Sequence, residues 1–307
     1  MMKPKVLFVA TVYRMHVQVF HLPYMKWFQD QGYEVHLCCR NDTPNPNITV
    51  PYCDKWMELP FERSPLNKAN ISVYKQLKAI IDYEDYALIH CNTPVGGVLG
   101  RLCARAARKK GTKVVYTAHG FHFFDGAPLK NWLLFYPIER LLSRCTDLLI
   151  TMNGEDDRRA RSFHARKTAM VNGVGVDLSR FEAPVDRQAV RASLGIPQDA
   201  HVVITVGEHS ERKNHETVLR ALAELPGVHV LFCGVGDRED SLKAMAQELG
   251  MAERAHFLGL RSDVPQLLGD PALRGKMAER NRSIMHNYSL EAVQKQMTAL
   301  YREQLNG

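Results

Sequence analysis

Apolar stretches of strand length alternate with segments of helical periodicity from residue 5 to residue 171. The apolar runs occupy 5–10, 34–39, 87–91, 113–118, 147–152 and 168–171. Helical spacing marks 21–33, the face formed by Ile71, Tyr74, Leu77, Ile80 and Ile81, and 95–111. Because the strands are apolar on both faces and helices separate them, the pattern predicts a parallel sheet covered by helices on both sides.

A second series of the same kind begins after a polar, proline-containing segment near residue 183. Apolar runs at 201–208, 228–234 and 255–260 alternate with helical segments at about 214–225 and 238–250. Two such series predict two Rossmann-like domains, in which ligands bind at the carboxyl ends of the strands. The boundaries that we predict are 1–182 for the first domain, 183–270 for the second and 271–307 for C-terminal helices.

The alternation stops early in the second domain. After residue 268 the chain has two helical segments and no further apolar run of strand length. The second sheet is therefore predicted to have about three strands, which leaves it with an open edge. We expect either that the C-terminal helices at 271–306 cover this edge or that the second half of the chain is loosely packed.

Composition and charge narrow the class of protein. The 307 residues are 45% hydrophobic and 24% charged, which is typical of a globular chain with about two domains. Fourteen Lys and Arg face six Asp and Glu in 101–170, a net charge of +8, while the whole chain carries +7. This basic stretch predicts an anionic partner. The chain has no recognisable nucleic-acid-binding signature, so we expect no nucleic acid.

Cysteine usage and hydropathy bear on the compartment. The seven cysteines include no CxxC pair, which is typical of reduced thiols in a cytosolic protein. No apolar run reaches the ~18 residues that a membrane span needs. We therefore expect a cytoplasmic protein, either soluble or bound peripherally to the inner face of the cell membrane.

Several long strings of the chain resemble a known enzyme family. They are HLPYMKWFQDQGYEVHLCC (21–39), IHCNTPVGGVLGRLCARAARKKGTKVVYTAHGFHFF (89–124), GAPLKNWLLFYPIERLLSRCTDLLITMN (126–153), VGEHSERKNHE (206–216) and FCGVGD (232–237). These strings are similar to bacterial family-4 glycosyltransferases of the exopolysaccharide and capsule type. The resemblance implies the α/β GT-B fold, with the nucleotide-sugar bound mainly by the second domain and the acceptor mainly by the first. It also implies a retaining transferase that needs no metal ion and no cofactor. The implied donor is a nucleotide-sugar, with UDP as the expected carrier, and the implied acceptor is a glycan or a lipid-linked molecule.

One part of the family pattern is missing. DVPQLL (263–268) is followed almost at once by DPALR (270–274), where the family has an acidic segment and closing strands. Three strand–helix units correspond to a loss on the order of 90 residues. The missing carboxylates are those that the resemblance assigns to the nucleotide ribose and the donor sugar. The alternative interpretation is therefore an inactive remnant that binds a glycan or another partner.

The resemblance implies roles for polar residues at strand ends of the first domain. His119 matches a histidine that contacts the transferred sugar, where a neutral imidazole can hydrogen-bond a hydroxyl group and position it. His90 and Asn92 end the preceding strand, and Arg14 and His16 lie in the loop after the first strand. These four are candidates for acceptor contact, and the structural alternative is hydrogen bonding within the fold.

The second domain contributes the candidates for the donor. Lys213 follows a strand and begins a helix, where a cation beside helix N–H groups suits a diphosphate. Arg212 is an alternative to it. Gly234 and Gly236 let the backbone approach a base or phosphate, and Arg261 matches a motif near the base. Solvated caps, an ordinary turn and a local salt bridge are the structural alternatives.

The segment 127–144 mixes aromatic and basic residues. Trp132 and Phe135, with Lys130 and Arg140 nearby, suit an acidic membrane surface or a lipid-linked acceptor. Packing of the aromatic rings on the sheet is the structural alternative.

Histidines are frequent in the first domain and raise the question of a metal. They are His16, His21, His36, His90, His119 and His122. Their spacing matches no HExxH or comparable ligand pattern, so we expect no metal site.

Overall fold

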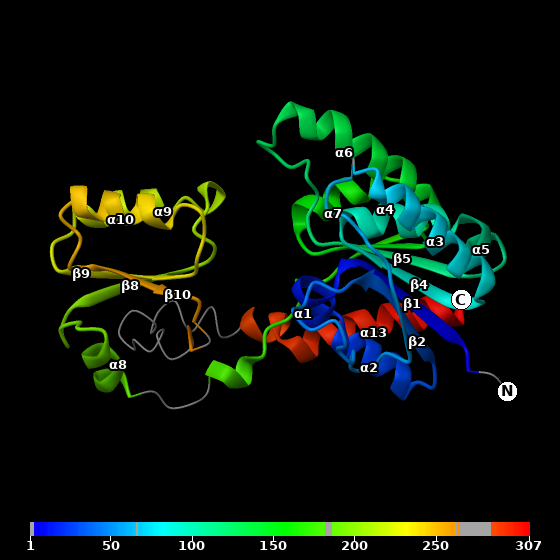
Figure 1. The fold of residues 1–307 in the computed structure, drawn as a ribbon, viewed down its shortest axis with the longest axis horizontal. Coiled ribbons are helices and arrows are strands. Elements are labelled where there is room, and N and C mark those ends of the chain that lie inside the picture. Colours follow the sequence, from blue (N-terminus) through cyan, green and yellow to red (C-terminus); the bar gives the residue numbers. More distant parts are fainter. Residues whose placement is uncertain (1–2, 66, 182–185, 262, 265–283) are drawn as a thin grey trace. The chain divides into compact units, whose positions relative to one another are not determined.

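The computed structural model describes residues 3–65, 67–181, 186–261, 263–264 and 284–307. The chain divides into two compact units, one of residues 1–176 with 284–307 and one of residues 177–283. Each unit is a parallel sheet flanked by helices, as the sequence predicts (Figure 1). None of the described helices combines the length and apolarity that a membrane crossing requires.

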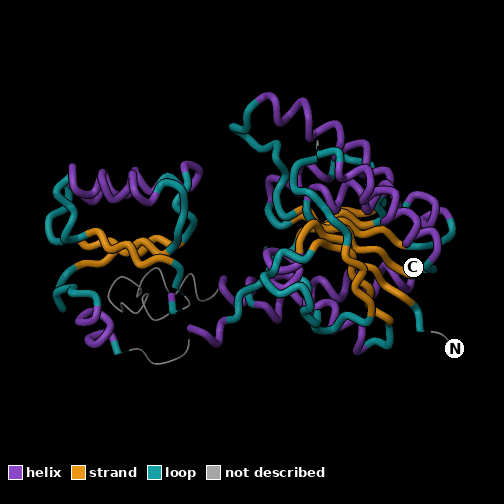
Figure 2. The backbone as a smooth tube through the Cα atoms, in the orientation of Figure 1, coloured by secondary structure: helices purple, strands orange, loops and turns teal. Residues whose placement is uncertain are grey.

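A seven-stranded parallel sheet forms the centre of the first unit. Its strands are β1 (Lys5–Val12), β2 (Glu34–Arg40), β3 (Lys55–Glu58), β4 (Tyr86–Asn92), β5 (Lys113–Ala118), β6 (Leu148–Thr151) and β7 (Lys167–Met170). Their order in space is β3-β2-β1-β4-β5-β6-β7. Figure 2 shows the strands in orange with helices in purple on both sides of the sheet. The order reverses between β1 and β4, so the ligand-binding edge of this doubly wound sheet lies at the carboxyl ends of these two strands.

Helices cover both faces of this sheet (Figure 1). One face carries α3 (Ala69–Tyr83), α4 (Pro94–Cys103), α5 (Arg105–Lys109), α6 (Leu129–Leu142) with the short η2 (Ser143–Cys145), and α7 (Gly154–Ala160). The other face carries α2 (Leu22–Asp30) and α13 (Leu290–Asn306), and η1 (Tyr13–Val17), α1 (Gln18–Phe20) and η5 (His286–Tyr288) complete the unit. Two separate clusters of buried apolar side chains fill the spaces between the sheet and these layers.

Two glycines explain how closely α4 packs on the sheet. A Cβ atom on Gly97 would lie 2.4 Å from the ring of Tyr116 in β5, and one on Gly100 would lie 2.5 Å from Cys91 Sγ in β4. Such distances leave no room for any side chain. The predicted helix at 95–111 is divided at Ala104 into α4 and α5.

The C-terminal helix α13 belongs to the first unit. Its residues Val293, Met297 and Tyr301 are fully buried in the cluster on the α2 side of the sheet. Ser289 caps the helix, because its Oγ accepts a hydrogen bond from the Ala292 N–H at 3.1 Å. One of the two expectations was that the C-terminal helices cover the open edge of the second sheet. Helix α13 packs on the first sheet instead, and residues 271–283 lie outside the described residues.

The second unit is a three-stranded parallel sheet with strand order β10-β9-β8. Its strands are β8 (His201–Val206), β9 (Val228–Cys233) and β10 (Ala255–Gly259), which agrees with the predicted number in the described part of this unit. The helical elements are η3 (Leu178–Phe181), α8 (Arg187–Ser193), η4 (Glu211–Lys213), α9 (His215–Ala223) and α10 (Glu239–Glu248). Helices α9 and α10 lie on one face of the sheet and α8 on the other (Figure 1).

Candidate functional site

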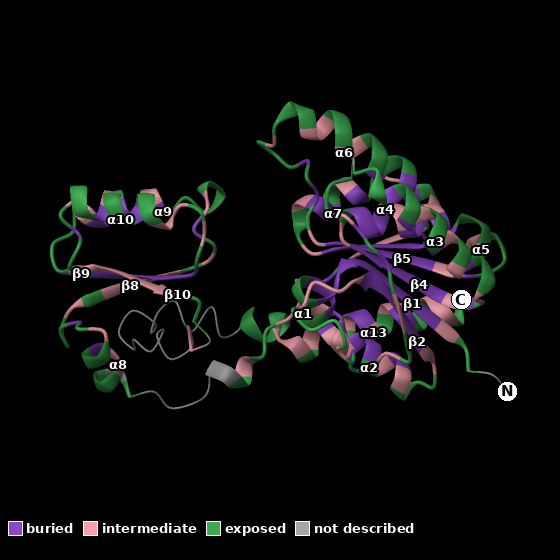
Figure 3. Ribbon diagram, viewed as in Figure 1, coloured by how far each residue is buried: buried purple, intermediate pink, exposed green. Residues whose placement is uncertain are grey.

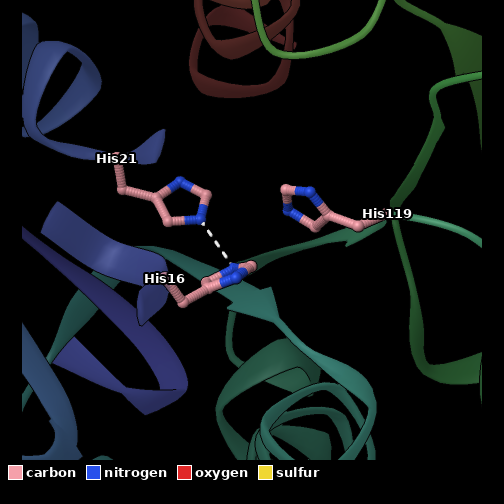
Figure 4. Close-up of side chains that lie close together, drawn as sticks. All are labelled: His16, His21 and His119. Carbon is pink, nitrogen blue, oxygen red and sulfur yellow. Dashed lines mark hydrogen bonds between the residues drawn. The ribbon is translucent and has the colours of Figure 1, made fainter. Parts of the chain in front are cut away.

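Three histidines converge where the first sheet reverses its strand order. His16 lies in η1 after β1, His21 lies just before α2, and His119 directly follows β5 (Figure 4). The Nε2 atoms of His16 and His21 are 3.1 Å apart, and the ring centres of His16 and His119 are 4.6 Å apart. All three segments lie at the edge where ligands bind in such sheets.

Burial keeps these imidazoles neutral. Desolvation lowers the pKa of His16 to about 3 and that of His119 to about 4, and it lowers the pKa of His21 well below its usual value. Among the described residues, His119 Nε2 and His21 Nδ1 are buried without a hydrogen-bond partner. A buried polar atom without a partner is destabilising, so these two atoms are available to a ligand hydroxyl group.

The loop after β5 is built to present His119. Gly120 has φ +146°, a conformation that residues with a side chain rarely adopt. The N–H of Phe121 then donates to Asp156 Oδ2 at 3.1 Å, and Asn153 caps α7 beneath it by accepting from the Asp156 N–H at 2.9 Å. The position of His119 is therefore set by α7 as well as by β5.

His90 lies beside this cluster, and both of its ring nitrogens are within hydrogen-bond distance of protein atoms. Nε2 is 2.8 Å from Thr117 Oγ1, and Nδ1 is 2.9 Å from the hydroxyl of Tyr301 in α13. Burial lowers its pKa to about 3. These contacts match the structural alternative for His90 better than the predicted acceptor contact. No sequence pattern indicated its partner Tyr301, which lies 211 residues away.

Asn92 and Thr93 form an unusual corner after β4. Asn92 Nδ2 donates to His90 O at 3.3 Å, while Asn92 Oδ1 is buried without a partner among the described residues. Thr93 has φ +62°, an outlier for a β-branched residue. The Thr93 and Thr11 hydroxyl groups, 2.7 Å apart, hold this conformation. Strain of this kind concentrates at functional sites.

A hollow of about 300 Å³ opens beside this corner. Its lining includes Thr11, Thr93, His16 and Arg63. Arg14, the remaining acceptor candidate, is exposed, and its backbone N–H is held by Asp42 Oδ1 at 2.5 Å. Arg63, Thr93 and Asp42 were not predicted from the sequence, because all three lie in loops without a periodic pattern.

In the second unit, the predicted donor residues lie around the turn after β8. Lys213 is exposed, and its aliphatic stem crosses Gly207, with Cε 3.6 Å from the position of an added Cβ. Arg212 lines a hollow of about 480 Å³ together with Arg238, which pairs with Glu216. Glu211 also lines the hollow, so the positive charge that this edge of the second sheet offers to a phosphate group is partly compensated.

The structure explains why residues 234 and 236 are glycines, which the sequence did not reveal. A Cβ on Gly234 would lie 1.9 Å from Gly207 O, and one on Gly236 would lie 2.3 Å from His209 O. The space beside both glycines is thus filled by the neighbouring loop. Arg261 forms the local salt bridge that was its structural alternative, because it donates two hydrogen bonds of 2.7 and 2.5 Å to Asp263.

The predicted membrane-facing residues of α6 divide between its two faces. Lys130 and Arg140 are exposed. Trp132 and Phe135 are half-buried and pack against the buried cluster beneath the helix, which matches the structural alternative for these two residues.

The three converging histidines are also the set that could hold a metal ion. One nitrogen from each of His16, His21 and His119 lies within 4.8 Å of the others, and imidazole nitrogens are good zinc ligands. Sequence spacing could not reveal this set, because the three side chains come from separate segments. The absence of a metal from the reaction stays a prediction.

Comparison with known proteins identifies the family. A model of glycosyl transferase 4-like domains matches residues 5–153, and a model of group 1 glycosyl transferases matches residues 186–272. The chain is 42% identical over 275 residues, 87% of this chain and 71% of the relative, to EpsD of Bacillus subtilis (strain 168), a protein described as a glycosyltransferase.

Solved structures share the fold. Anabaena HepE in complex with UDP and glucose matches with a TM-score of 0.64 and 20% identity, over 86% of this chain and 71% of that chain. A glycosyltransferase from Rickettsia africae ESF-5 matches with a TM-score of 0.67 and 12% identity, over 99% of both chains. With its two Rossmann-like units and these relatives, the chain belongs to the family-4 glycosyltransferases of the GT-B fold.

Proposed function

We propose that the chain transfers a sugar from a UDP-sugar to a glycan or lipid-linked acceptor in surface polysaccharide biosynthesis, in the cytoplasm at the inner face of the cell membrane. The observation that carries the proposal is a group of buried polar atoms at the carboxyl edge of the first sheet that have no hydrogen-bond partner within the described part of the chain: His119 Nε2, His21 Nδ1 and Asn92 Oδ1. Sugar hydroxyl groups can both donate to and accept from such atoms. The kinship with EpsD and the fold shared with HepE, solved with UDP and glucose, support the same proposal.

The proposed reaction retains the configuration of the anomeric carbon. The bond from this carbon to the diphosphate oxygen breaks, and the acceptor oxygen bonds to the carbon on the same face. The acceptor's proton passes to the departing diphosphate. Lys213 and Arg212 neutralise the charge that develops on the diphosphate, and His119 positions the sugar as a neutral imidazole, without a metal ion.

A second candidate function is glycan or partner binding without transfer. The observation that favours it is in the sequence, where the acidic segment that the family uses for the donor is missing between 268 and 270. The first unit, with two buried clusters of its own, would then keep the acceptor site.

Thermal unfolding with UDP-, GDP- and dTDP-sugars separates these two functions. A ligand at 100 times its dissociation constant adds about 2.7 kcal/mol to the stability of the state that binds it. We expect a shift with UDP-sugars, followed by turnover whose product keeps the anomeric configuration in its NMR spectrum. The binding function is favoured instead if no nucleotide-sugar shifts the transition.

Two controls make this experiment specific. Lys213→Met should abolish the donor-dependent shift, whereas Arg220→Met, at an exposed position of α9, should leave it unchanged. The shift should also survive EDTA. Loss of the shift in EDTA and its recovery with zinc would contradict the proposed metal independence and assign the metal to His16, His21 and His119.

A further inference from the structure

The outward face of α6 is unusually apolar. Leu129 is 72% exposed, Leu133 71% and Leu141 61%, and Leu134 and Ile138 are exposed between them. These five side chains lie on the exposed half of the helix, while the aromatic residues of α6 pack against the buried cluster. Figure 3 shows the exposed stretches of α6 in green. Apolar residues are normally scattered on the surface of a monomer, and a continuous row of them marks an interaction site.

The charged side chains that α6 exposes to solvent are all positive. Lys130 and Arg140 are exposed, as is Arg144 in η2, one turn beyond the helix. The single acidic residue of α6, Glu139, faces inward and pairs with the fully buried Arg101 at 2.8 Å. The exposed surface of α6 therefore combines aliphatic and cationic side chains without a carboxylate.

A basic hollow continues this surface at the end of η2. It has a volume of about 290 Å³ and is lined by Arg105, Arg108, Lys109, Arg144, Cys145 and Arg166. Asp147 contacts two of them, with bonds of 2.9 Å from Arg108 and a distance of 3.4 Å from Arg166. Among the described residues, no ion pair engages Arg105, Lys109 or Arg144. The hollow thus carries uncompensated positive charge.

We propose that the outward face of α6 and this basic hollow form a docking surface for an anionic lipid bilayer. The helix, about 21 Å long, lies in the plane of the membrane with its leucines at the boundary of the acyl chains. The hollow receives the phosphate of an anionic headgroup. Stable attachment needs two such signals, an apolar one and a polybasic one, and this surface supplies both.

The inference deepens the proposed function and rests on it for its purpose, because a lipid-linked acceptor would reside in the same membrane. The start of α6 lies ten residues after His119, the proposed sugar contact, so docking along the helix brings that edge of the first sheet near the bilayer. The hollow lies at the opposite edge, next to the start of β7. Lipid binding and donor binding therefore use different residues and can be measured separately.

Sedimentation with vesicles tests the docking surface on the full chain. One set is phosphatidylcholine alone and the other contains about 30% phosphatidylglycerol, a charge density comparable to that of anionic membranes. We expect binding to the anionic vesicles only, and its loss in high salt. Replacing Arg105, Lys109 and Arg144 together by Gln should weaken binding about 100-fold, from about fivefold per charge.

A second variant pair tests the apolar component. Leu133→Gln with Leu141→Gln should weaken anionic-vesicle binding at least tenfold, in line with the burial energy of leucine. The matched controls lie on α3, where Ile71 is 61% exposed and Lys75 is also exposed. Ile71→Gln and Lys75→Gln should bind as the unchanged chain does.

Three results would overturn the docking surface. The first is equal binding to neutral and anionic vesicles, and the second is unchanged binding by both variants. The third is a chain that binds no vesicles but forms a dimer, which Leu133→Gln dissociates. If inorganic phosphate alone displaces the chain from the vesicles, the hollow is a site for a free anion and the proposal of bilayer docking is contradicted. All variants should keep the thermal shift with UDP-sugars, so a failure of the docking surface is distinct from a failure of the proposed transferase.

Discussion

The first unit buries the five central strands of its sheet, whereas the second unit leaves much of its sheet accessible to water. In β1 every residue after Lys5 is buried, but in β8 none is, and β10 is half-buried throughout (Figure 3). The central strand β9 is as buried as the five central strands of the first sheet. In the described part of the second sheet, two of the three strands are edge strands, so fewer backbone and side-chain groups are shielded. We infer that the second unit is the less stable of the two.

The distribution of tryptophan makes this comparison measurable. All three tryptophans, Trp27, Trp56 and Trp132, belong to the first unit. Tryptophan fluorescence therefore follows the unfolding of the first unit alone, whereas circular dichroism follows both. Two transitions that do not coincide would identify the units as separate folding domains, and each variant below can be assigned to the unit that it affects.

Acidification should produce the largest difference between the units. Four buried histidines of the first unit have a folded-state pKa far below the ordinary value of 6.5: His16, His21, His90 and His119. Below pH 6.5 the unfolded chain binds protons that the folded chain does not bind until about pH 4. Stability is therefore lost as pH falls through this window, by about 1.4 kcal/mol per pH unit for each histidine.

The measurement is fluorescence-detected unfolding in urea at several pH values between 7.5 and 5. His16→Gln should make the dependence on pH shallower by the contribution of one histidine, whereas His122→Gln, at an exposed position, should not change the slope. A first unit whose stability is constant down to pH 5 would mean that these imidazoles are hydrated in solution.

The buried ion pair beneath α6 should give the next largest effect. Arg101 is fully buried, pairs with Glu139 and stacks on Tyr116 with its guanidinium 3.8 Å from the ring centre. Glu139→Gln leaves this charge without a counter-ion and should destabilise the first unit by about 3–5 kcal/mol. The exposed Asp85→Asn serves as the control. An unchanged fluorescence midpoint for Glu139→Gln would show that water reaches Arg101.

The sequence predicted the fold of the first unit well, for a physical reason. Strands buried on both faces are continuous apolar runs, so the five central strands were found, and β7 was found as a shorter run although it is only half-buried or exposed. β3 was missed because it is an edge strand of four residues, only half-buried or exposed, and its sequence KWME has no apolar run. Which residues of α6 face the core was not predicted, because the helix carries apolar residues on both faces.

The site was predicted only in part. His119 could be placed at a strand end from local sequence, since the carboxyl edge of a parallel sheet is where ligands bind. The convergence of His16, His21 and His119 depends on how three loops fold back, and the contact of Tyr301 with His90 depends on the packing of a helix from the far end of the chain. No periodic pattern carries such information.

A glycine substitution should affect the second unit alone, by a smaller amount. Gly234→Ala would place a Cβ 1.9 Å from Gly207 O, and the loop after β8 would have to move. We expect a loss of about 1–3 kcal/mol in the transition seen by circular dichroism, as for other overpacked positions, with the fluorescence midpoint unchanged. Gly250→Ala is the control for backbone strain alone, because Gly250 has φ +66° and open space around it. Equal losses for both variants would remove the loop contact as the cause.

The smallest predicted effect tests where α13 packs in solution. Tyr301→Phe removes only the hydroxyl that bonds His90 Nδ1 at 2.9 Å, and the loss should be about 1–2 kcal/mol, since a buried nitrogen is left without its partner. Tyr83→Phe, 87% exposed, should be neutral. If α13 covers the first sheet, only the fluorescence transition moves. If the circular dichroism transition of the second unit moves instead, α13 stabilises the second sheet, and the contrast between a closed first unit and an open second unit fails.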